Sequence, residues 1–250
     1  MKITVGHSSE AMAKAAATTA AEILREAIRH KGRAVFIAAT GASQFEFLKQ
    51  LVAASGVAWD RTTMFHLDEY IGMSADHPAS FRRYLRERLT SKVPIATVHF
   101  IEGDVADLDG EVVRLNRLLA AVQVDVAFVG VGENGHLAFN DPPADFGTET
   151  PYLVVSLDEA CRRQQMGEGW FKTLDDVPRR AISMSVKQIM KSAHIICTVP
   201  EKRKARAMQA CLEGEVGPML PASILRTHPS CSLFLDPESA SLLTPATLSA

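Results

Sequence analysis

The sequence has no long hydrophobic run and no excess of charge of either sign. No apolar stretch in its 250 residues approaches the roughly 18 that a membrane-spanning helix needs. Glu10, Lys14 and Glu22 interrupt the alanine-rich start, which is therefore not typical of an export signal. Lys and Arg number 27 against 29 Asp and Glu, a formal net charge of -2. We therefore expect no nucleic-acid or membrane partner, and an anionic ligand would need a local site.

Cysteine is scarce and follows no recognisable spacing. The four cysteines are far apart and form no CxxC pair, which argues against a zinc ribbon, a redox dithiol or a disulfide framework. They are Cys161, Cys197, Cys211 and Cys231. This usage suits a reducing compartment, and we expect a cytoplasmic protein.

The chain also lacks an internal repeat, a low-complexity tract and a linker rich in Gly, Ser or Pro. With 47% hydrophobic residues it is long enough to bury one large core. We therefore expect a single domain over residues 1–250.

Short apolar runs alternate with helix-length segments along the chain. The first helix is predicted from about residue 10 to His30, because Ser8 or Ser9 can cap its start and Gly32 follows a basic last turn. Buried strands are predicted at 34–38, 62–67, 97–101, 124–130, 180–186, 194–199 and 231–236. Further helices are predicted at about 43–55, 79–90, 109–121, 158–168, 201–213 and 221–227. This alternation predicts an α/β fold, a mainly parallel sheet with helices on both faces and ligands at the carboxyl ends of its strands.

The first predicted strand runs into the small residues Ala39, Thr40, Gly41, Ala42 and Ser43 and then into a helix. Such a turn lets the backbone approach a ligand, and unpaired N–H groups at the helix start can hold a phosphate. An ordinary tight turn with Ser43 as the N-cap is the alternative. The full GxxxxGK[ST] and GxGxxG patterns are absent, which argues against a nucleoside triphosphate or a dinucleotide.

The next strand ends in FHLDEYIG, residues 65–72, where alternation places His66 and Asp68 on one face. A carboxylate at a strand end between aromatic residues can have a raised proton affinity and act as a base, so Asp68 is the candidate base. Alternatively, Asp68 caps the following turn. His66 and Asp68 could begin a metal site, but no further ligand stands at a recognisable spacing, so no metal is expected.

The third strand end is GVGENGHLAFNDPP, residues 130–143. Its glycines allow unusual backbone angles, so His136 can project from the turn toward whatever the sheet binds. Histidine both gives and takes a proton near neutral pH, and Asn134 or Asp141 can fix its orientation. A lone histidine is more often structural, but one surrounded by Gly, Asn and Asp at a strand end favours chemistry.

These motifs together resemble the glucosamine-6-phosphate deaminase (isomerase) family. The resemblance rests on FHLDEYIG followed by HPASFRRYL and GVGENGHLAFNDP, and it extends over the turn at 39–43, EKRKARAMQ and PASILRTHP in matching order. It implies a Rossmann-like sheet and a hydrolase/isomerase that converts an amino-sugar 6-phosphate to fructose 6-phosphate and ammonia without an organic cofactor. Relatives range from monomers to hexamers, so the resemblance leaves a homo-oligomer open.

The resemblance also implies roles for individual residues. Asp68 matches the carboxylate that moves a proton between C2 and C1, and His136 matches the residue that opens the sugar ring. The phosphate would lie on the backbone of Thr40, Gly41, Ala42 and Ser43, beside Lys204, with Gly135 in the histidine loop also at the substrate. An arginine near 162 or 163, taken as Arg163, should reach the phosphate as well.

Two departures from the family pattern concern the histidine. Asn134 stands where the best-known members have Asp, and Asp141 stands where they have Glu. Asn carries no charge, and Asp141 is shorter than Glu by roughly 1.5 Å, a misplacement that can cost about 10²-fold in rate. Either Asp141 alone orients His136 in a variant of the same machinery, or the chain handles a related sugar phosphate.

Two other functions compete with the deaminase. A 6-phosphogluconolactonase of the same superfamily typically reads DER where this chain has Asp68, Glu69 and Tyr70, and lacks the FN-acid-Pro ending at 139–142. A non-catalytic sugar-phosphate sensor would need a DNA-binding segment. The basic cluster at 202–204 and those at 82–83 and 86–88 are interpreted as solvated helix faces or subunit contacts.

Overall fold

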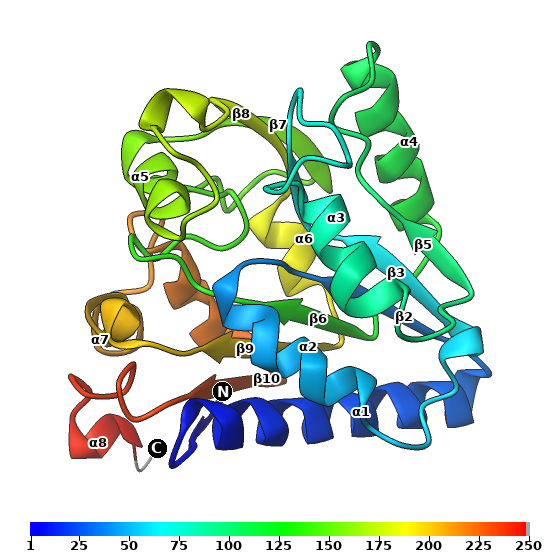
Figure 1. Ribbon diagram of the computed structural model, residues 1–250. Helices are drawn as coiled ribbons and strands as arrows, with labels where there is room; N and C mark the ends of the chain where they lie inside the picture. Colours follow the sequence, from blue (N-terminus) through cyan, green and yellow to red (C-terminus); the bar gives the residue numbers. More distant parts are fainter. Residues whose placement is uncertain (249–250) are drawn as a thin grey trace.

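The computed structural model describes residues 1–248 and is built on a seven-stranded, fully parallel sheet (Figure 1). Its strand order is β1-β10-β9-β6-β2-β3-β5, so the predicted α/β class with a mainly parallel sheet is confirmed. The strands are β1 (Lys2–Val5), β10 (Cys231–Leu235), β9 (His194–Val199), β6 (Val126–Val129), β2 (Ala34–Ala38), β3 (Thr62–His66) and β5 (Thr97–His99).

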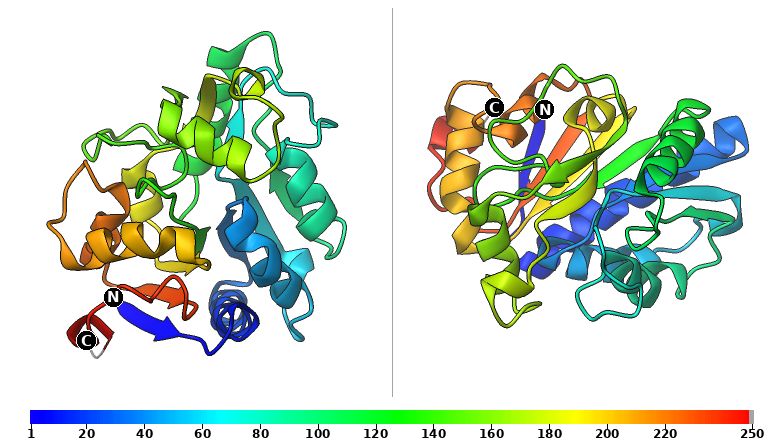
Figure 2. Two further views of the ribbon diagram at one scale, coloured as in Figure 1. Left: turned by 60° about the vertical axis from the view of Figure 1, so that its left-hand side comes forward. Right: turned by 90° about the horizontal axis from the view of Figure 1, so that it is seen from above.

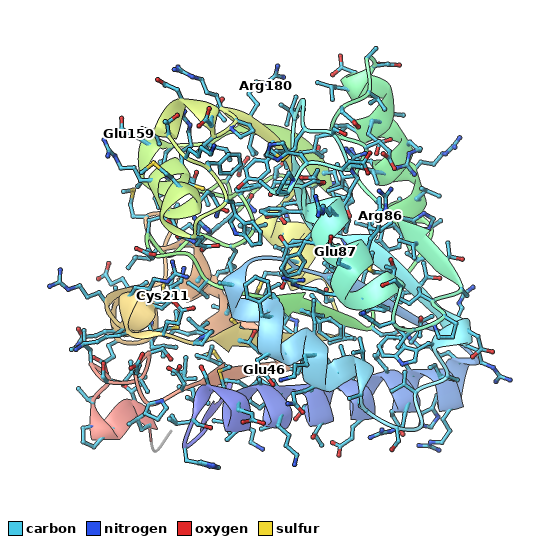
Figure 3. All side chains as sticks on the ribbon, viewed as in Figure 1. Glu46, Arg86, Glu87, Glu159, Arg180 and Cys211 are labelled. Carbon is cyan, nitrogen blue, oxygen red and sulfur yellow. The ribbon has the colours of Figure 1, made fainter. Side chains whose placement is uncertain are left out.

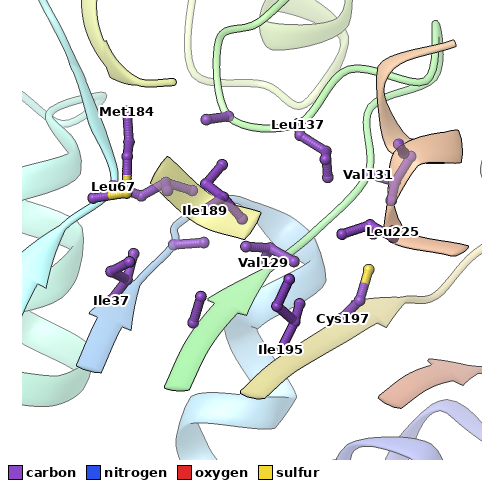
Figure 4. Close-up of a cluster of buried hydrophobic side chains, with 14 of the residues drawn as sticks. Ile37, Leu67, Val129, Val131, Leu137, Met184, Ile189, Ile195, Cys197 and Leu225 are labelled. Atoms are coloured by element: carbon purple, nitrogen blue, oxygen red, sulfur yellow. The ribbon is translucent and has the colours of Figure 1, made fainter. Parts of the chain in front are cut away.

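Successive strand residues point to opposite faces of this sheet, and both faces are hydrophobic. Helices therefore cover both faces, and the strand residues divide between two hydrophobic clusters. Phe36 and Phe128 pack with α1 (Ser9–Lys31) and α2 (Phe45–Val52), which lie together in both views of Figure 2. Ile37 and Val129 face the opposite way, into a second cluster drawn in Figure 4. That cluster also includes residues of α4 (Leu108–Ala120), α6 (Val186–Met190) and α7 (Ala205–Glu213).

The first helix ends where its caps predict. The Ser8 side chain accepts a hydrogen bond from the backbone N–H of Ala11, and Gly32 at φ 73° donates its N–H to the carbonyl oxygen of Ile28. The remaining helices are α3 (Phe81–Leu85), continuing as the π-helical turn η3 (Arg86–Thr90), α5 (Glu159–Gly167) and α8 (Pro245–Leu248). Short 3-10 helices are η1 (Ala42–Gln44), η2 (Trp59–Arg61), η4 (Leu174–Asp176), η5 (Lys202–Lys204) and η6 (Pro221–Thr227).

A second, antiparallel sheet corrects the sequence prediction. It has the order β4-β8-β7, with β4 (Asp68–Tyr70), β8 (Arg180–Met184) and β7 (Tyr152–Ser156). The run at 180–186 therefore forms a strand outside the central sheet, and its last residue already belongs to α6, which Ser185 caps. The chain leaving β3 joins the two sheets at Leu67, whose N–H bonds to Ala38 and whose carbonyl accepts the N–H of Met184.

The central sheet changes its winding direction between β2 and β6. From β2 the chain adds β3 and β5 on one side, and it then crosses to add β6, β9 and β10 on the other. Crossovers that diverge in this way leave a crevice beyond the carboxyl ends of the two strands. The register places Ala38 beside His66 and Ile37 beside Ala127, so the predicted strand-end motifs meet at this crevice.

Two expectations from composition agree with the structure. All four cysteines are buried free thiols. Within residues 1–248, every helix is too short or too polar to cross a membrane.

Candidate active site

A pocket lies at the carboxyl ends of the central strands. Residues following β2, β3, β6 and β9 line it, and α5 contributes side chains from the small-sheet side. The pocket therefore lies at the point where the winding of the sheet reverses. Asp68 and His136, predicted from separate strand ends, both line it.

The turn after β2 forms one wall of the pocket. Ala39, Thr40, Gly41, Ala42 and Ser43 all line the cavity. Gly41 has φ 89°, a left-handed conformation that favours glycine, and the residues after it form η1 and then α2. The side chain of Ser43 does not cap α2, whose N-cap position is held by the next residue without a side-chain hydrogen bond. The backbone N–H groups of this turn thus provide the kind of surface that holds a phosphoryl group.

A buried glutamine that sequence reasoning missed fixes this turn to the sheet. The amide nitrogen of Gln44 donates to the carbonyl of Val129 at 3.3 Å and to the hydroxyl of Thr198 at 2.8 Å. Gly130 leaves room for the turn, since a Cβ there would lie 2.5 Å from Oγ of Ser43. The turn is therefore held against the ends of β6 and β9.

Asp68 opens β4 with its side chain buried at the pocket wall. Burial, and then the neighbouring charge of Glu69, raise the pKa of Asp68 to about 8. Its Oδ1 has no hydrogen-bond partner among the described residues. A carboxyl group that holds its proton near neutral pH and has a free oxygen is suited to exchanging a proton with a ligand.

The capping role considered for Asp68 belongs instead to Glu69. The Glu69 carboxylate accepts the N–H groups of Phe81 and Arg82 and the hydroxyl of Ser80 at the start of α3. Because Glu69 is fixed in this way, the backbone that carries Asp68 is fixed too.

His66 does not share a site with Asp68. The strand β3 ends at His66 and β4 begins at Asp68, so regular alternation stops at the residue between them. His66 is fully buried, its Nδ1 lies 3.5 Å from the N–H of Ile101, and burial lowers its pKa to about 3. It does not line the pocket that Asp68 lines.

The histidine loop aims the imidazole of His136 into the pocket. Gly132 packs against the ring, because a Cβ on this residue would lie 2.4 Å from Cε1 and Nε2. Gly135 does not line the pocket; at φ 83° it shapes the loop, and its carbonyl accepts the N–H of Ala222. The structure therefore shows a conformational role for Gly135, and its contact with substrate stays a prediction.

Asp141 orients the imidazole through a single oxygen. Nδ1 of His136 lies 3.1 Å from Oδ1 of Asp141. Burial alone would raise the pKa of Asp141, but the hydrogen bond and the charge of His136 outweigh it, and the pKa is lowered. Asn134 donates from Nδ2 to the same oxygen at 3.2 Å and accepts the N–H of His136. Asn134 therefore holds the carboxylate and the loop, although it carries no charge.

The basic side chains at the pocket differ from the prediction in one place. Lys204, in η5 after β9, is buried and lines the pocket, and its contact with the phosphate stays a prediction. Arg163 lies on the outer side of α5, with 62% of its side chain exposed, and pairs with Glu159, which Figure 3 labels at the surface. Arg162 is buried and donates to the carbonyl oxygens of Leu174 and Val177. Neither arginine lines the pocket, so the structure does not bring Arg163 to the turn at 39–43 as the predicted phosphate contact requires.

Other polar residues at the pocket were not predicted. Arg203, adjacent to Lys204, lines the pocket rather than a solvated helix face. Gln164, Gln165 and Glu168 reach it from α5 and its C-cap. The only sequence signal for Arg203 was its place four residues after the end of a predicted strand, and the α5 residues carried none.

Three potential metal-binding side chains come together behind the pocket. Donor atoms of His136, Asp141 and Cys161 lie within 4.8 Å of one another. Asp141 already accepts hydrogen bonds from His136, Asn134 and the N–H of Asp158. Burial raises the pKa of Cys161 far above its usual range, which disfavours the thiolate that a metal requires. The cluster is better suited to orienting His136.

This fold and site define an α/β protein in which a carboxyl group, a histidine and a turn of small residues line one pocket at the switch point of a parallel sheet. Residues 7–233 match the family described as glucosamine-6-phosphate isomerases/6-phosphogluconolactonase. The chain belongs to this family.

Known relatives agree with that membership. A protein named glucosamine-6-phosphate deaminase from Streptococcus pneumoniae strain 70585 is 35% identical over 222 residues, covering 89% of this chain and 92% of the relative. A solved structure of a monomeric glucosamine-6-phosphate deaminase matches with a TM-score of 0.87 and 30% identity, covering 97% of this chain and all of that one. The 6-phosphogluconolactonase from Trypanosoma brucei matches with a TM-score of 0.80 at 18% identity over 97% of this chain and 98% of that one, which shows the shared fold alone.

Proposed function

We propose that this chain deaminates and isomerises an amino-sugar 6-phosphate, with glucosamine 6-phosphate as the substrate and fructose 6-phosphate and ammonia as products. The observation that carries the proposal is the convergence of Asp68 and His136 on one pocket with the turn at 39–43. The relatives at 30–35% identity that are named for this activity support it.

In the proposed complex the phosphoryl group lies on the backbone of the turn. Residues 41–43 lead through η1 into the start of α2, whose dipole favours an anion. Lys204 adds a positive charge from the end of β9. Burial lowers the pKa of Lys204, and the nearby carboxylate of Glu168 opposes that effect. A dianionic ligand would favour the charged form of Lys204 further.

Ring opening falls to His136. The ring oxygen of the pyranose gains a proton while the hydroxyl on C1 loses one, so a single imidazole can carry out both transfers. Asp141 holds Nδ1, which leaves Nε2 for the sugar. The product of this step is the open-chain aldehyde.

Proton transfer between carbons falls to Asp68. As a carboxylate it removes the proton from C2, which is acidic because C1 is now a carbonyl carbon. The electrons of the C–H bond form the C1–C2 double bond of an enolamine, while the carbonyl oxygen takes a proton from the ammonium group of the substrate. The protonated carboxyl group then returns the proton to C1, which leaves an imine at C2. Water adds to this imine and ammonia leaves, giving fructose 6-phosphate. The reaction is therefore an isomerisation followed by hydrolysis, and a purely hydrolytic description would omit its first half.

The two departures around His136 support the same machinery in a variant form. Asp141 reaches Nδ1 at 3.1 Å despite its shorter side chain, and Asn134 supplies a hydrogen bond where a second charge is absent. This geometry favours the first of the two alternatives, in which Asp141 alone orients the imidazole.

As part of the same proposal, we expect residues 1–250 to act as one domain in a reducing cytoplasm. The four free thiols support a reducing compartment. Sedimentation of the purified chain would establish whether it is a monomer or a homo-oligomer.

A substrate panel tests the proposed activity. Ammonia and ketose phosphate release would be measured with glucosamine 6-phosphate, its galacto and N-acetyl counterparts, and 6-phosphogluconolactone. We expect release from glucosamine 6-phosphate and no accelerated hydrolysis of the lactone. Lactone hydrolysis without ammonia release would replace the deaminase with the lactonase, and tight sugar-phosphate binding without any turnover would point to a sensor.

A further inference from the structure

Arg203 is the one pocket cation that sequence reasoning assigned to solvent, and it contacts three carboxylates. Its Nε donates to Glu201 at 2.6 Å, Nη1 donates to Glu133 at 3.3 Å, and Nη2 lies 3.8 Å from Oε1 of Glu168. These carboxylates come from the end of β9, the histidine loop and the C-cap of α5. Arg203 thus joins three walls of the pocket, next to Lys204.

Glu168 is the unusual member of this group, because its carboxylate lies beside the anion-binding turn. Its side chain is only 5% exposed. Oε1 accepts a hydrogen bond from Gln164 at 3.0 Å, whereas the buried Oε2 has no partner among residues 1–248. A Cβ placed on Gly41 would lie 4.0 Å from Oε2. A carboxylate oxygen therefore lies against the surface that the phosphoryl group requires.

The carboxylate of Glu168 and a bound phosphoryl group would compete for the positive charges of Arg203 and Lys204. A phosphoryl group offers three strong acceptor oxygens and more charge than a carboxylate, and the planar guanidinium of arginine can bind two of those oxygens at once. The Nη2 to Glu168 separation of 3.8 Å is an ion pair without a good hydrogen bond. Of the three contacts of Arg203, the one with Glu168 is therefore the weakest and the easiest to exchange.

We propose that Arg203 binds the phosphoryl group of the substrate, and that Glu168 is the competing anion which this group displaces. The proposal rests on the proposed function for its sugar-phosphate ligand. Arg163, the arginine first predicted for this contact, lies on the outer side of α5 instead. Displacement of Glu168 makes phosphoryl binding selective, because a weaker anion has to overcome the same resident carboxylate with less charge.

Calorimetric binding of fructose 6-phosphate, inorganic phosphate and unphosphorylated fructose to the full chain tests the proposal. The variants are Arg203→Met, Arg203→Lys and Glu168→Gln. The matched controls are Arg206→Met, an exposed arginine one turn further on, and Glu159→Gln, an exposed carboxylate on α5. Thermal melting checks that each variant folds. If Arg203→Met does not fold, the binding affinities of Arg203→Lys and Glu168→Gln test the proposal in its place.

Substitutions of Arg203 and Glu168 should change the affinity for phosphate in opposite directions. Arg203→Met should weaken fructose 6-phosphate and inorganic phosphate by about 10- to 100-fold, the effect of losing a charge-assisted hydrogen bond. Arg203→Lys should weaken phosphate binding by roughly 3- to 10-fold, because the positive charge stays and the bidentate guanidinium is lost. Glu168→Gln should tighten both phosphates by about 3- to 10-fold, and this gain should vanish in the double variant with Arg203→Met. Neither control should change binding.

Two results would overturn the inference: unchanged phosphate affinity in Arg203→Met, or unchanged or weaker affinity in Glu168→Gln. Ammonia release by the unmodified chain separates this outcome from failure of the proposed function. If the unmodified chain releases ammonia normally and Arg203→Met has an unchanged KM, Arg203 does not bind the phosphoryl group and the proposed deaminase activity stands. If the unmodified chain releases no ammonia but the variants show the predicted changes in phosphate affinity, the deaminase activity is wrong and the contact of Arg203 with a phosphoryl group stands.

Discussion

The two halves of the pocket are built in different ways. On the catalytic side, His136 and Asp141 are five residues apart in one loop, and Asp68 directly follows the junction between two strands. On the anion side, Arg203 meets carboxylates from 70 residues away in the histidine loop and from the end of α5. Local geometry sets the first group of contacts, whereas only the complete fold brings the second group together.

This difference suggests a division of labour. The catalytic side contains few charges, and burial tunes them individually, as the raised pKa of Asp68 shows. The anion side contains several opposing charges that can exchange partners. Substitutions on the first side should therefore change kcat, and substitutions on the second side should change KM for phosphorylated ligands.

Asp68→Asn should have the largest effect. The amide cannot accept the proton from C2, so kcat should fall by about 10³- to 10⁴-fold. Because the anion side is untouched, calorimetric binding of fructose 6-phosphate should stay within about twofold of the unmodified chain. A variant that keeps its turnover would remove Asp68 from proton transfer.

His136→Gln should have the next largest effect, and a selective one. Turnover of the cyclic substrate should fall by about 10²-fold, since ring opening loses its acid and base. An analogue locked in the open-chain form bypasses that step, so its C2 proton exchange, followed by NMR, should be nearly normal. Equal loss on both compounds would show that His136 acts beyond ring opening.

Lys204→Met tests the anion side. We expect KM for the phosphorylated substrate to rise by about 10- to 100-fold while kcat changes little, because the lysine contributes a point charge. Arg163→Met serves as the control on an exposed arginine. Binding of unphosphorylated sugar should be the same in both variants. A large fall in kcat for Lys204→Met would contradict the claim that the anion side contributes to binding alone.

The pKa of Asp68 predicts a smaller, pH-dependent effect on stability. A carboxyl group with a pKa of about 8 in the folded chain and 3.8 as its reference value keeps its proton better when folded. Its contribution to stability is fully present below pH 3.8, falls as pH rises, and is lost above about pH 8. Asp68→Asn should therefore gain stability relative to the unmodified chain as pH rises from 5 to 9, by an amount on the order of a few kcal/mol.

Denaturant unfolding at several pH values measures this gain, and Asp60→Asn, in η2 away from the pocket, provides the control. The same pKa predicts that kcat/KM rises with pH up to about 8, because only the carboxylate can accept the proton from C2. A stability difference that does not change with pH would contradict the raised pKa.

The sequence predicted those features that depend on local pattern. The seven parallel strands include six that the apolar runs located, and Ser8 and Gly32 marked both ends of α1. The strands β1, β4 and β7 were missed. Of these, β4 has only three residues, and β7 is only partly buried and pairs antiparallel with β8. Periodicity within one segment contains no information on which distant segment it pairs with.

The same limit explains the outcome within the site. Glycine-rich strand ends and a histidine five residues from an aspartate are visible in the sequence, and they identified the catalytic side. The side on which Arg163 lies depends on how α5 packs, and the cluster at 202–204 divides into an exposed Lys202 and a buried Lys204. Helix orientation and burial of single charges follow from tertiary packing, so the anion side could be only partly predicted.

The central claim is that one buried carboxyl group carries a proton from C2 to C1 of a sugar held in this pocket. The most direct test uses glucosamine 6-phosphate deuterated at C2, with NMR of the fructose 6-phosphate formed in ordinary water. Because Asp68 is shielded from solvent, part of the deuterium should appear at C1, and Asp68→Asn should form almost no product. Product formed by Asp68→Asn at the normal rate and with the same deuterium pattern would contradict the account.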